Sequence, residues 1–127
     1  MPGASTLPPA AACLPDGWLL PDWPVPGHVH AVCTARPGGV SRDAWSALNL
    51  GDHVGDDPDA VLANREHLRA RLVDLGGGAA VAPTFLRQVH GTAVADLERG
   101  APDGTEADAC IARLPGRACT IMVADCL

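Results

Sequence analysis

The stretch that organises this chain is Thr84-Phe85-Leu86-Arg87-Gln88-Val89-His90-Gly91. Its apolar residues favour β structure, it follows a linker of Gly, Ala and Pro, and a glycine ends it, so the pattern predicts a buried strand. His90 is then expected at the end of that strand. A strand that opens into a glycine turn fixes the backbone of a reactive side chain and leaves space in front of it.

A second candidate for chemistry is Cys126, which closes an apolar run close to the C-terminus. An imidazole and a thiol can bind a metal ion together, and they can also act as base and nucleophile without a metal. A lone histidine at a strand end is more often a packing residue than a ligand. The residues themselves leave these alternatives open.

The composition excludes several classes of protein. A chain of 127 residues fits one domain. The net charge is -6 and all nine basic residues are arginines scattered along the chain, so there is no basic stripe for nucleic acid. No apolar run approaches the roughly 18 to 20 residues that span a bilayer, and the first dozen residues carry no lysine or arginine ahead of an apolar segment, so we expect a soluble protein that is not exported. Five cysteines without CxxC spacing fit reduced thiols, so we expect a cytoplasmic protein without a membrane partner.

The N-terminal region is expected to contribute little to the core. Residues 1–15 are rich in Pro and Ala and predict a flexible tail, which leaves residues 16–127 as the domain. An alternation of apolar and polar residues over 29–33 predicts a half-buried strand with His28 and His30 on one face. Without a third ligand nearby, we interpret these two histidines as a solvent-facing pair.

The strongest local signal is Asp57-Pro58-Asp59, which predicts the start of a helix with an N-cap acceptor, a proline in the first turn and an acid at the positive end of the dipole. Gly76-Gly77-Gly78 predicts its end. We assign Asn64 and His67 to the polar flank of this helix. The apolar stripe, which is expected to bury against a sheet, consists of Val61, Leu68, Leu72 and Leu75.

Further strands are predicted for residues 92–97, 108–113 and 117–124, the last with an apolar run over 121–123 that suits burial on both faces. Several strands with one capped helix indicate an α/β or α+β layered domain that is one layer short. The loop from Arg36 to Asn49 is either the lip of a pocket or an ordinary surface loop anchored by Trp45.

Several motifs follow one another in an order known from one family. They are Thr34-Ala35-Arg36-Pro37-Gly38-Gly39-Val40-Ser41, Leu48-Asn49-Leu50-Gly51, His53-Val54-Gly55-Asp56-Asp57, Asn64-Arg65, Gln88-Val89-His90-Gly91, Ala107-Asp108-Ala109 and Ala124-Asp125-Cys126. On these residues the chain, from Trp23 onward, resembles the YfiH-type family. This family was once called multicopper polyphenol oxidases or laccase-domain proteins, and its members are now regarded as purine nucleoside phosphorylases.

The resemblance implies a layered α/β fold with a mixed sheet, similar to the catalytic domain of cytotoxic necrotizing factor. It implies a zinc site of two histidines and one cysteine, in which the motifs place His90 and Cys126, with zinc in preference to the copper of the older name. It also implies phosphorolysis of adenosine, inosine, guanosine and methylthioadenosine with phosphate as co-substrate, and deamination of adenosine in the same pocket. By motif membership, Arg36 is the candidate phosphate contact, and Asn49 and Gln88 are candidates for hydrogen bonds to base or ribose.

One departure from the family pattern affects the site. The third ligand of the family is a histidine in a His-Ala-Gly-Trp-Arg-Gly motif downstream of the cysteine, and this chain has no such motif. We therefore expect the N-terminal part of a truncated YfiH-like domain, which by itself binds metal weakly and is inactive. Cys110 replaces a residue that is more often aliphatic and is interpreted as a buried spare thiol. The alternatives are a metal-free cysteine hydrolase in which His90 activates Cys126, and an inactive fragment or interaction module.

Overall fold

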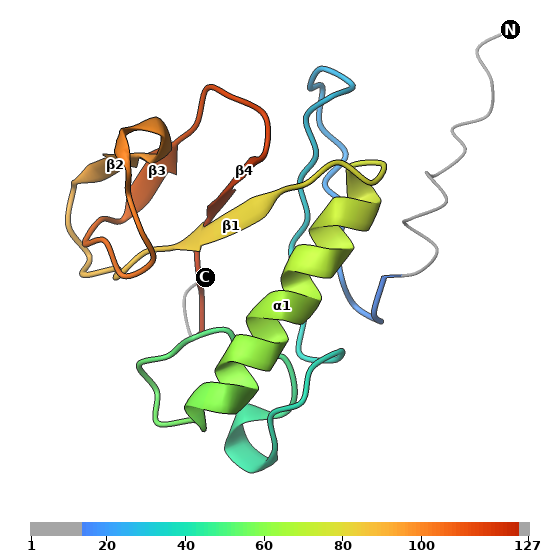
Figure 1. The fold of residues 1–127 in the computed structure, drawn as a ribbon. Helices are drawn as coiled ribbons and strands as arrows, with labels where there is room; N and C mark the ends of the chain where they lie inside the picture. Colours follow the sequence, from blue (N-terminus) through green and yellow to red (C-terminus); the bar gives the residue numbers. More distant parts are fainter. Residues whose placement is uncertain (1–13, 125–127) are drawn as a thin grey trace, which may run out of the picture. The chain divides into compact units, whose positions relative to one another are not determined.

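The computed structural model describes residues 14–124 (Figure 1). The chain divides into two compact units, Met1–Ala79 and Ala80–Leu127, and each is considered by itself. Cys126 and almost all of the predicted N-terminal tail lie outside the described residues. No helix within residues 14–124 is long and apolar enough to cross a membrane.

The first unit is built around one long helix, α1 (Pro58–Leu75), which follows the short 3-10 helix η2 (Asp43–Trp45). The carboxylate of Asp57 accepts a hydrogen bond from the backbone N–H of Asp59 at 2.9 Å, and Pro58 occupies the first turn. At the other end the N–H of Gly76 donates to the carbonyl of Leu72 at 3.0 Å. Both predicted ends of the helix are confirmed.

The buried face of α1 differs from the prediction at two positions, Asn64 and Leu72, of which Leu72 is only half-buried. Val61, Leu68 and Leu75 are buried as expected, but Asn64 is buried as well, with none of its surface exposed. Asn64 lies three residues after Val61 and four before Leu68, so helical geometry places it on the same face. Its assignment to the polar flank was therefore wrong, whereas His67 is exposed.

The predicted strand over residues 29–33 does not form. Within the described part of the first unit, Cys33 makes a single antiparallel bridge to Leu19, with N–H to carbonyl distances of 2.8 and 2.9 Å. Pro21, Pro24 and Pro26 follow in the partner segment, and a proline has no N–H with which to extend a ladder. His28 and His30 are exposed.

The second unit contains two parallel pairs of strands (Figure 1). The strand β1 (Ala82–Phe85) pairs with β4 (Arg117–Thr120), so that Ala82 lies opposite Arg117. The strand β2 (Val94–Asp96) pairs with β3 (Ala109–Ile111), and the 3-10 helix η3 (Leu97–Arg99) follows β2. The predicted α/β class is confirmed. A turn at Pro115 and Gly116 connects β3 to β4, but these two strands do not form a hairpin, since each pairs with an earlier strand.

The strands end earlier than the sequence predicts, and the difference is largest for β1 and β4. After Phe85 the backbone leaves β4, and the N–H of Arg87 donates to the carbonyl of Thr105 at 2.8 Å. His90 consequently lies in a loop and not at a strand end. The strand β4 stops at Thr120, and Ile121 and Val123 are 50% and 67% exposed, so the predicted doubly buried strand over 121–123 was wrong.

The core of the second unit is small. Its central cluster consists of Leu86, Ala95 and Ala107, with Ala101 and Cys110 packed against it. Alanine side chains fill little space, so the backbones of β2 and of the 105–108 segment can approach Leu86 closely. Cys110 is half-buried, in partial agreement with its interpretation as a buried thiol.

Candidate active site

The loop that carries His90 holds this residue in an unusual conformation. His90 is exposed and has a φ angle of 61°, in the left-handed region that residues with a side chain seldom adopt. Within residues 14–124 its imidazole makes no hydrogen bond. The side chain is therefore open to a ligand, and its position depends on whatever stabilises the turn.

The turn is stabilised by one carboxylate. Asp108 Oδ1 accepts hydrogen bonds from the backbone N–H groups of Val89 at 3.1 Å and Gly91 at 2.9 Å, and Oδ2 accepts from the N–H of His90 at 2.8 Å. The bond from Gly91 is the main reason that the pKa of Asp108 is lowered, with partial desolvation opposing it and the bonds from Val89 and His90 adding to it. The ionised carboxylate is thus the form that fits this loop.

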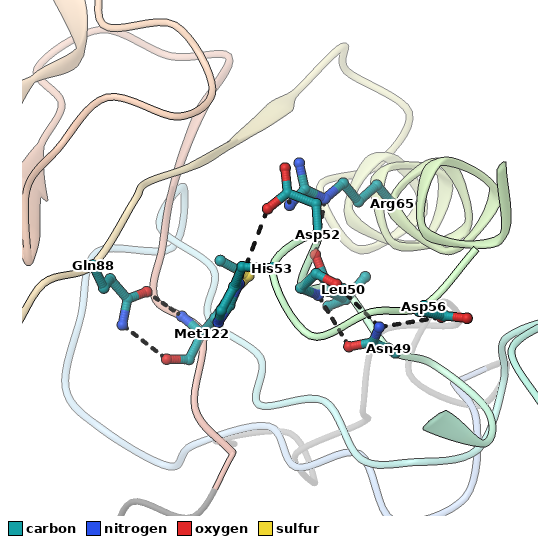
Figure 2. Close-up of polar contacts among 9 residues, drawn as sticks. Asn49, Leu50, Asp52, His53, Asp56, Arg65, Gln88 and Met122 are labelled. Atoms are coloured by element: carbon teal, nitrogen blue, oxygen red, sulfur yellow. Dashed lines mark hydrogen bonds and ion pairs between the residues drawn. The ribbon is translucent and has the colours of Figure 1, made fainter. Parts of the chain in front are cut away.

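Gln88 links the histidine loop to the segment after β4. Its amide donates from Nε2 to the carbonyl of Met122 at 2.9 Å and accepts at Oε1 from the N–H of Met122 at 2.8 Å (Figure 2). Through these two bonds the Gln88 side chain pairs with the backbone of Met122 as a neighbouring strand would. Gln88 precedes His90 by two residues and Met122 precedes Cys126 by four, so this amide connects the chain segments that lead to both predicted ligands.

The other two predicted substrate-binding residues lie in the first unit. Arg36 Nε donates to the carbonyl of Ser46 at 3.0 Å, and its own carbonyl accepts from the N–H of Leu48 at 2.8 Å. Asn49 Nδ2 donates to the carbonyl of Gly51 at 3.0 Å and to Asp56 Oδ2 at 3.1 Å (Figure 2). The side-chain amides of Asn49 and Gln88 are therefore both engaged within their own unit, and the exposed Arg36 uses Nε on its own loop.

A buried polar network joins this loop to α1. Asn64 Nδ2 donates to Ser41 Oγ and to the carbonyl of Asn49, both at 2.8 Å, and Asn64 Oδ1 accepts from the N–H of Val40 at 2.7 Å. The hydroxyl of Ser41 in turn donates to Asp56, and this bond is the main cause of the lowered pKa of Asp56, against partial desolvation. The chain of hydrogen bonds is continuous, so its members stabilise one another.

The position of Asn64 in this network also explains why residue 39 is a glycine. A Cβ at Gly39 would come within 2.5 Å of Asn64 Oδ1 and 2.4 Å of the carbonyl oxygen of Ala47. No real Cβ lies so close to an oxygen, so the loop can approach Asn64 only with glycine at this position.

The loop lines a cavity of about 420 Å³ within the first unit. This agrees with its prediction as a pocket lip, although Arg36 and Asn49 are not among the lining residues. Those residues are Val40, Ser41, Arg42, Asp43, Trp45, Asp56, Asp57 and Ala60.

The described residues do not by themselves contain a complete metal centre. Within residues 14–124 no group of three His, Cys, Asp or Glu side chains is placed to hold a metal ion. His90 is open, and Cys126 lies outside this range. The prediction that these two residues share a metal ion is therefore still a prediction. Three polar residues that the sequence analysis gave no role, Ser41, Asp56 and Asp108, prove central to the loops, and their membership in the family motifs is the signal that could have marked them.

Cys110 and Cys119 are neighbours in the second unit. Both thiols are free, and Cys119 is exposed on β4. Desolvation, followed by a hydrogen bond with Cys110, raises the pKa of Cys119 to about 11. Since the thiolate is the nucleophile, Cys119 is a poor candidate for covalent chemistry at neutral pH.

We expect iodoacetamide to alkylate Cys119 at pH 8 more slowly in the folded protein than in urea, by up to about a hundredfold because of the smaller thiolate fraction. Quantitative mass spectrometry of the Cys119 peptide measures both rates. Cys110→Ala should bring the folded rate closer to the unfolded one, since it removes the neighbouring thiol. Equal rates in folded and unfolded protein would contradict the expectation.

Comparison with known proteins assigns the chain to a family. Residues 30–127 match the model of a family described as multi-copper polyphenol oxidoreductase laccase, so the chain belongs to this family. Among the curated relatives it is 46% identical over 112 residues to a purine nucleoside phosphorylase of Pseudomonas aeruginosa and 41% identical over 109 residues to the purine nucleoside phosphorylase YfiH of Escherichia coli. It is a YfiH-type member of the family, as the resemblance indicated.

Solved structures support the same assignment. A crystal structure of a Neisseria meningitidis protein superposes with a TM-score of 0.76 at 38% identity, over 86% of this chain and 42% of that one. The structure of YlmD from Geobacillus stearothermophilus superposes with a TM-score of 0.56 at 26% identity, over 72% of this chain and 36% of that one. The alignments with the Pseudomonas and Escherichia relatives cover 88% and 86% of this chain but only 43% of each relative. The chain therefore spans less than half the length of these relatives.

Proposed function

We propose that the protein carrying this chain is a purine nucleoside phosphorylase, which uses phosphate to split the glycosidic bond of adenosine, inosine, guanosine and methylthioadenosine. The names of its relatives support the reaction class. The observation that carries the proposal to particular residues is the exposed His90, held in a left-handed turn by three hydrogen bonds to Asp108. A loop stabilised in this way presents one side chain in a fixed direction.

We further propose that His90 and Cys126 hold a zinc ion, with a histidine that this chain does not contain as the third ligand. The exposed imidazole of His90 fits this role, and a thiolate with imidazoles is a donor set that suits zinc, which we propose in preference to the copper of the older family name. When bound, zinc would supply a Lewis acid, which could also serve adenosine deamination. With two of three ligands, the 127-residue chain alone should bind zinc weakly and show little activity.

Substrate binding is assigned to three residues. Phosphorolysis requires a cation for phosphate while positive charge develops on the ribose, and we propose the guanidinium of Arg36 for this contact. For Asn49 and Gln88 we propose hydrogen bonds to the base or ribose. Since their amides already bind Asp56 and Met122, such bonds would have to use the remaining hydrogen-bonding capacity of each group. We also propose that the protein works in the cytoplasm, which suits the free thiols Cys33, Cys110 and Cys119.

Arg36→Ala is expected to raise the KM for phosphate by about tenfold or more, with a smaller effect on the KM for nucleoside, because it removes a charge-assisted contact to the anion. Initial rates at varied phosphate, in the full-length protein, measure this change. Arg42→Ala, an exposed arginine of the same loop, is the matched control. If only Arg42→Ala changed the phosphate dependence, the assignment of Arg36 would be wrong.

The same pair of residues could instead act as a metal-free cysteine hydrolase, and metal analysis separates the two reactions. We expect close to one zinc per chain in the full-length protein, loss of that zinc in His90→Ala, and nucleoside cleavage that requires phosphate. Cleavage that proceeds without metal and without phosphate, and that a thiol alkylator blocks, would favour the hydrolase. A protein that folds, binds no zinc and cleaves nothing would favour an interaction module.

A further inference from the structure

The contact between Asp108 and the histidine loop has a geometry found in anion sites. Successive backbone N–H groups point toward one side when a residue among them has a left-handed conformation, and the resulting concavity binds anions. Here the left-handed residue is His90, and the N–H groups of Val89, His90 and Gly91 converge on the carboxylate of Asp108. The anion that fills this concavity is therefore part of the chain itself.

The carboxylate compensates for the conformation of His90. A left-handed residue with a side chain is strained and persists only where its surroundings stabilise it. Within the described residues, the side chain of Asp108 is the only partner of these three N–H groups. The backbone of Asp108 is held separately, because its N–H donates to the carbonyl of Ala93 at 3.1 Å.

The conformation also decides where the imidazole projects. The direction of a Cα–Cβ bond follows from φ and ψ, so a change of His90 from the left-handed to an extended conformation would turn its side chain toward another side of the loop. All three hydrogen bonds that the carboxylate makes among residues 14–124 go to backbone N–H groups and none goes to the imidazole, so its main hold on the ring is through the backbone, with a weaker electrostatic interaction beside it.

We propose that Asp108 is a positioning residue: by binding the N–H groups of Val89, His90 and Gly91, its carboxylate sets the direction of the His90 imidazole toward the ion or substrate that this ring contacts. This inference rests on the role proposed above for His90. Its distinct content is that the loop conformation, and not a hydrogen bond to the ring, connects Asp108 to the site.

The decisive variant is Asp108→Asn. Asparagine has the same shape, but it can accept hydrogen bonds at only one of its two terminal atoms, so a donor would face at least one of the three backbone N–H groups. Asp96→Asn is the matched control, because Asp96 is also a half-buried carboxylate of the second unit that accepts from a backbone N–H, that of Glu98 at 3.2 Å. Nuclear magnetic resonance of the full-length protein gives the carbon shifts of His90, which report its backbone conformation, and competition with a chromogenic chelator gives the zinc Kd.

In Asp108→Asn we expect His90 to lose its left-handed carbon shifts and the zinc Kd to rise by about 10- to 100-fold, the range seen when the partner of a metal ligand is removed. Asp96→Asn should change neither quantity. Left-handed shifts retained in Asp108→Asn, or an unchanged zinc Kd despite altered shifts, would overturn the proposal.

Two further measurements keep the proposal testable. If Asp108→Asn does not fold, hydrogen exchange in the unmodified protein decides, since the exposed amides of Val89, His90 and Gly91 should exchange at least about tenfold more slowly than unstructured amides. Exchange of these amides at the unstructured rate would refute the proposal that the Asp108 carboxylate holds them. If His90→Ala binds zinc as tightly as the unmodified protein, the metal role of His90 fails, whereas the carbon shifts in Asp108→Asn still decide whether the carboxylate sets the loop.

Discussion

Replacing His90 with alanine should lower kcat/KM for the phosphorolysis of adenosine by at least about a hundredfold, which corresponds to about 2.7 kcal/mol of transition-state stabilisation. Loss of a metal ligand has at least the effect of losing the residue that orients it. The exposed His90 makes no hydrogen bond through its ring to other described residues, so its removal should cost little folding stability. Steady-state kinetics of the full-length protein, together with the free energy of unfolding, measure both effects.

His67→Ala is the control for this experiment, because His67 is an exposed histidine on α1 without a proposed role in the reaction. It should retain the activity of the unmodified protein. Activity within a factor of two of normal in His90→Ala would contradict the placement of the reaction at this loop.

Asn64→Leu should lower the free energy of unfolding by about 2 to 4 kcal/mol. Leucine has the same number and branching of side-chain heavy atoms as asparagine but is larger and cannot hydrogen-bond, so three hydrogen bonds are lost and its methyl groups crowd the buried site. The N–H of Val40 and the carbonyl of Asn49 would then lose the partner that they have at 2.7 and 2.8 Å. Since the same network holds Ser41 and Asp56, the loop that carries Arg36 should also loosen, and the KM for phosphate should rise. Urea denaturation measures the stability.

His67→Leu places the same side chain on the exposed face of the same helix and should change the free energy of unfolding by less than about 0.5 kcal/mol. A similarly small change in Asn64→Leu would show that the network contributes little.

The network around Asn64, Ser41 and Asp56 should also weaken in acid. Its hydrogen bonds lower the pKa of Asp56, so the stabilisation from this carboxylate is present above its ordinary pKa of 3.8 and is lost as the pH falls below that value through the lowered pKa.

The helix could be predicted from the sequence because its signals are local. Asp57 caps the first turn, Pro58 fits its geometry and glycines follow Leu75, and all of these lie within a few residues of the ends that they determine. The strands could be located only in part, because their extent depends on distant partners. The strand β1 pairs in parallel with β4, and nothing within the apolar run that follows Thr120 indicates that the pairing stops there.

The candidate site could be predicted as a set of residues but not as a set of contacts. The motifs identified His90, Gln88 and Asn49, yet the structure shows that the amide of Gln88 is already bound to the backbone of Met122 and that of Asn49 to its own loop. Asn64 looked like a solvated helix residue because its burial depends on a loop from another part of the chain. The family motif marks Asp108 as a residue of interest, but no sequence signal reveals that its carboxylate binds the backbone of His90, 18 residues away.

The most direct test of the central claim is a crystal structure of the full-length protein, measured at the zinc absorption edge. We predict a single anomalous peak bonded to a ring nitrogen of His90 at about 2.0 to 2.1 Å and to the sulfur of Cys126 at about 2.3 Å. A zinc ion bound elsewhere, or His90 and Cys126 on different faces of the domain, would contradict the account.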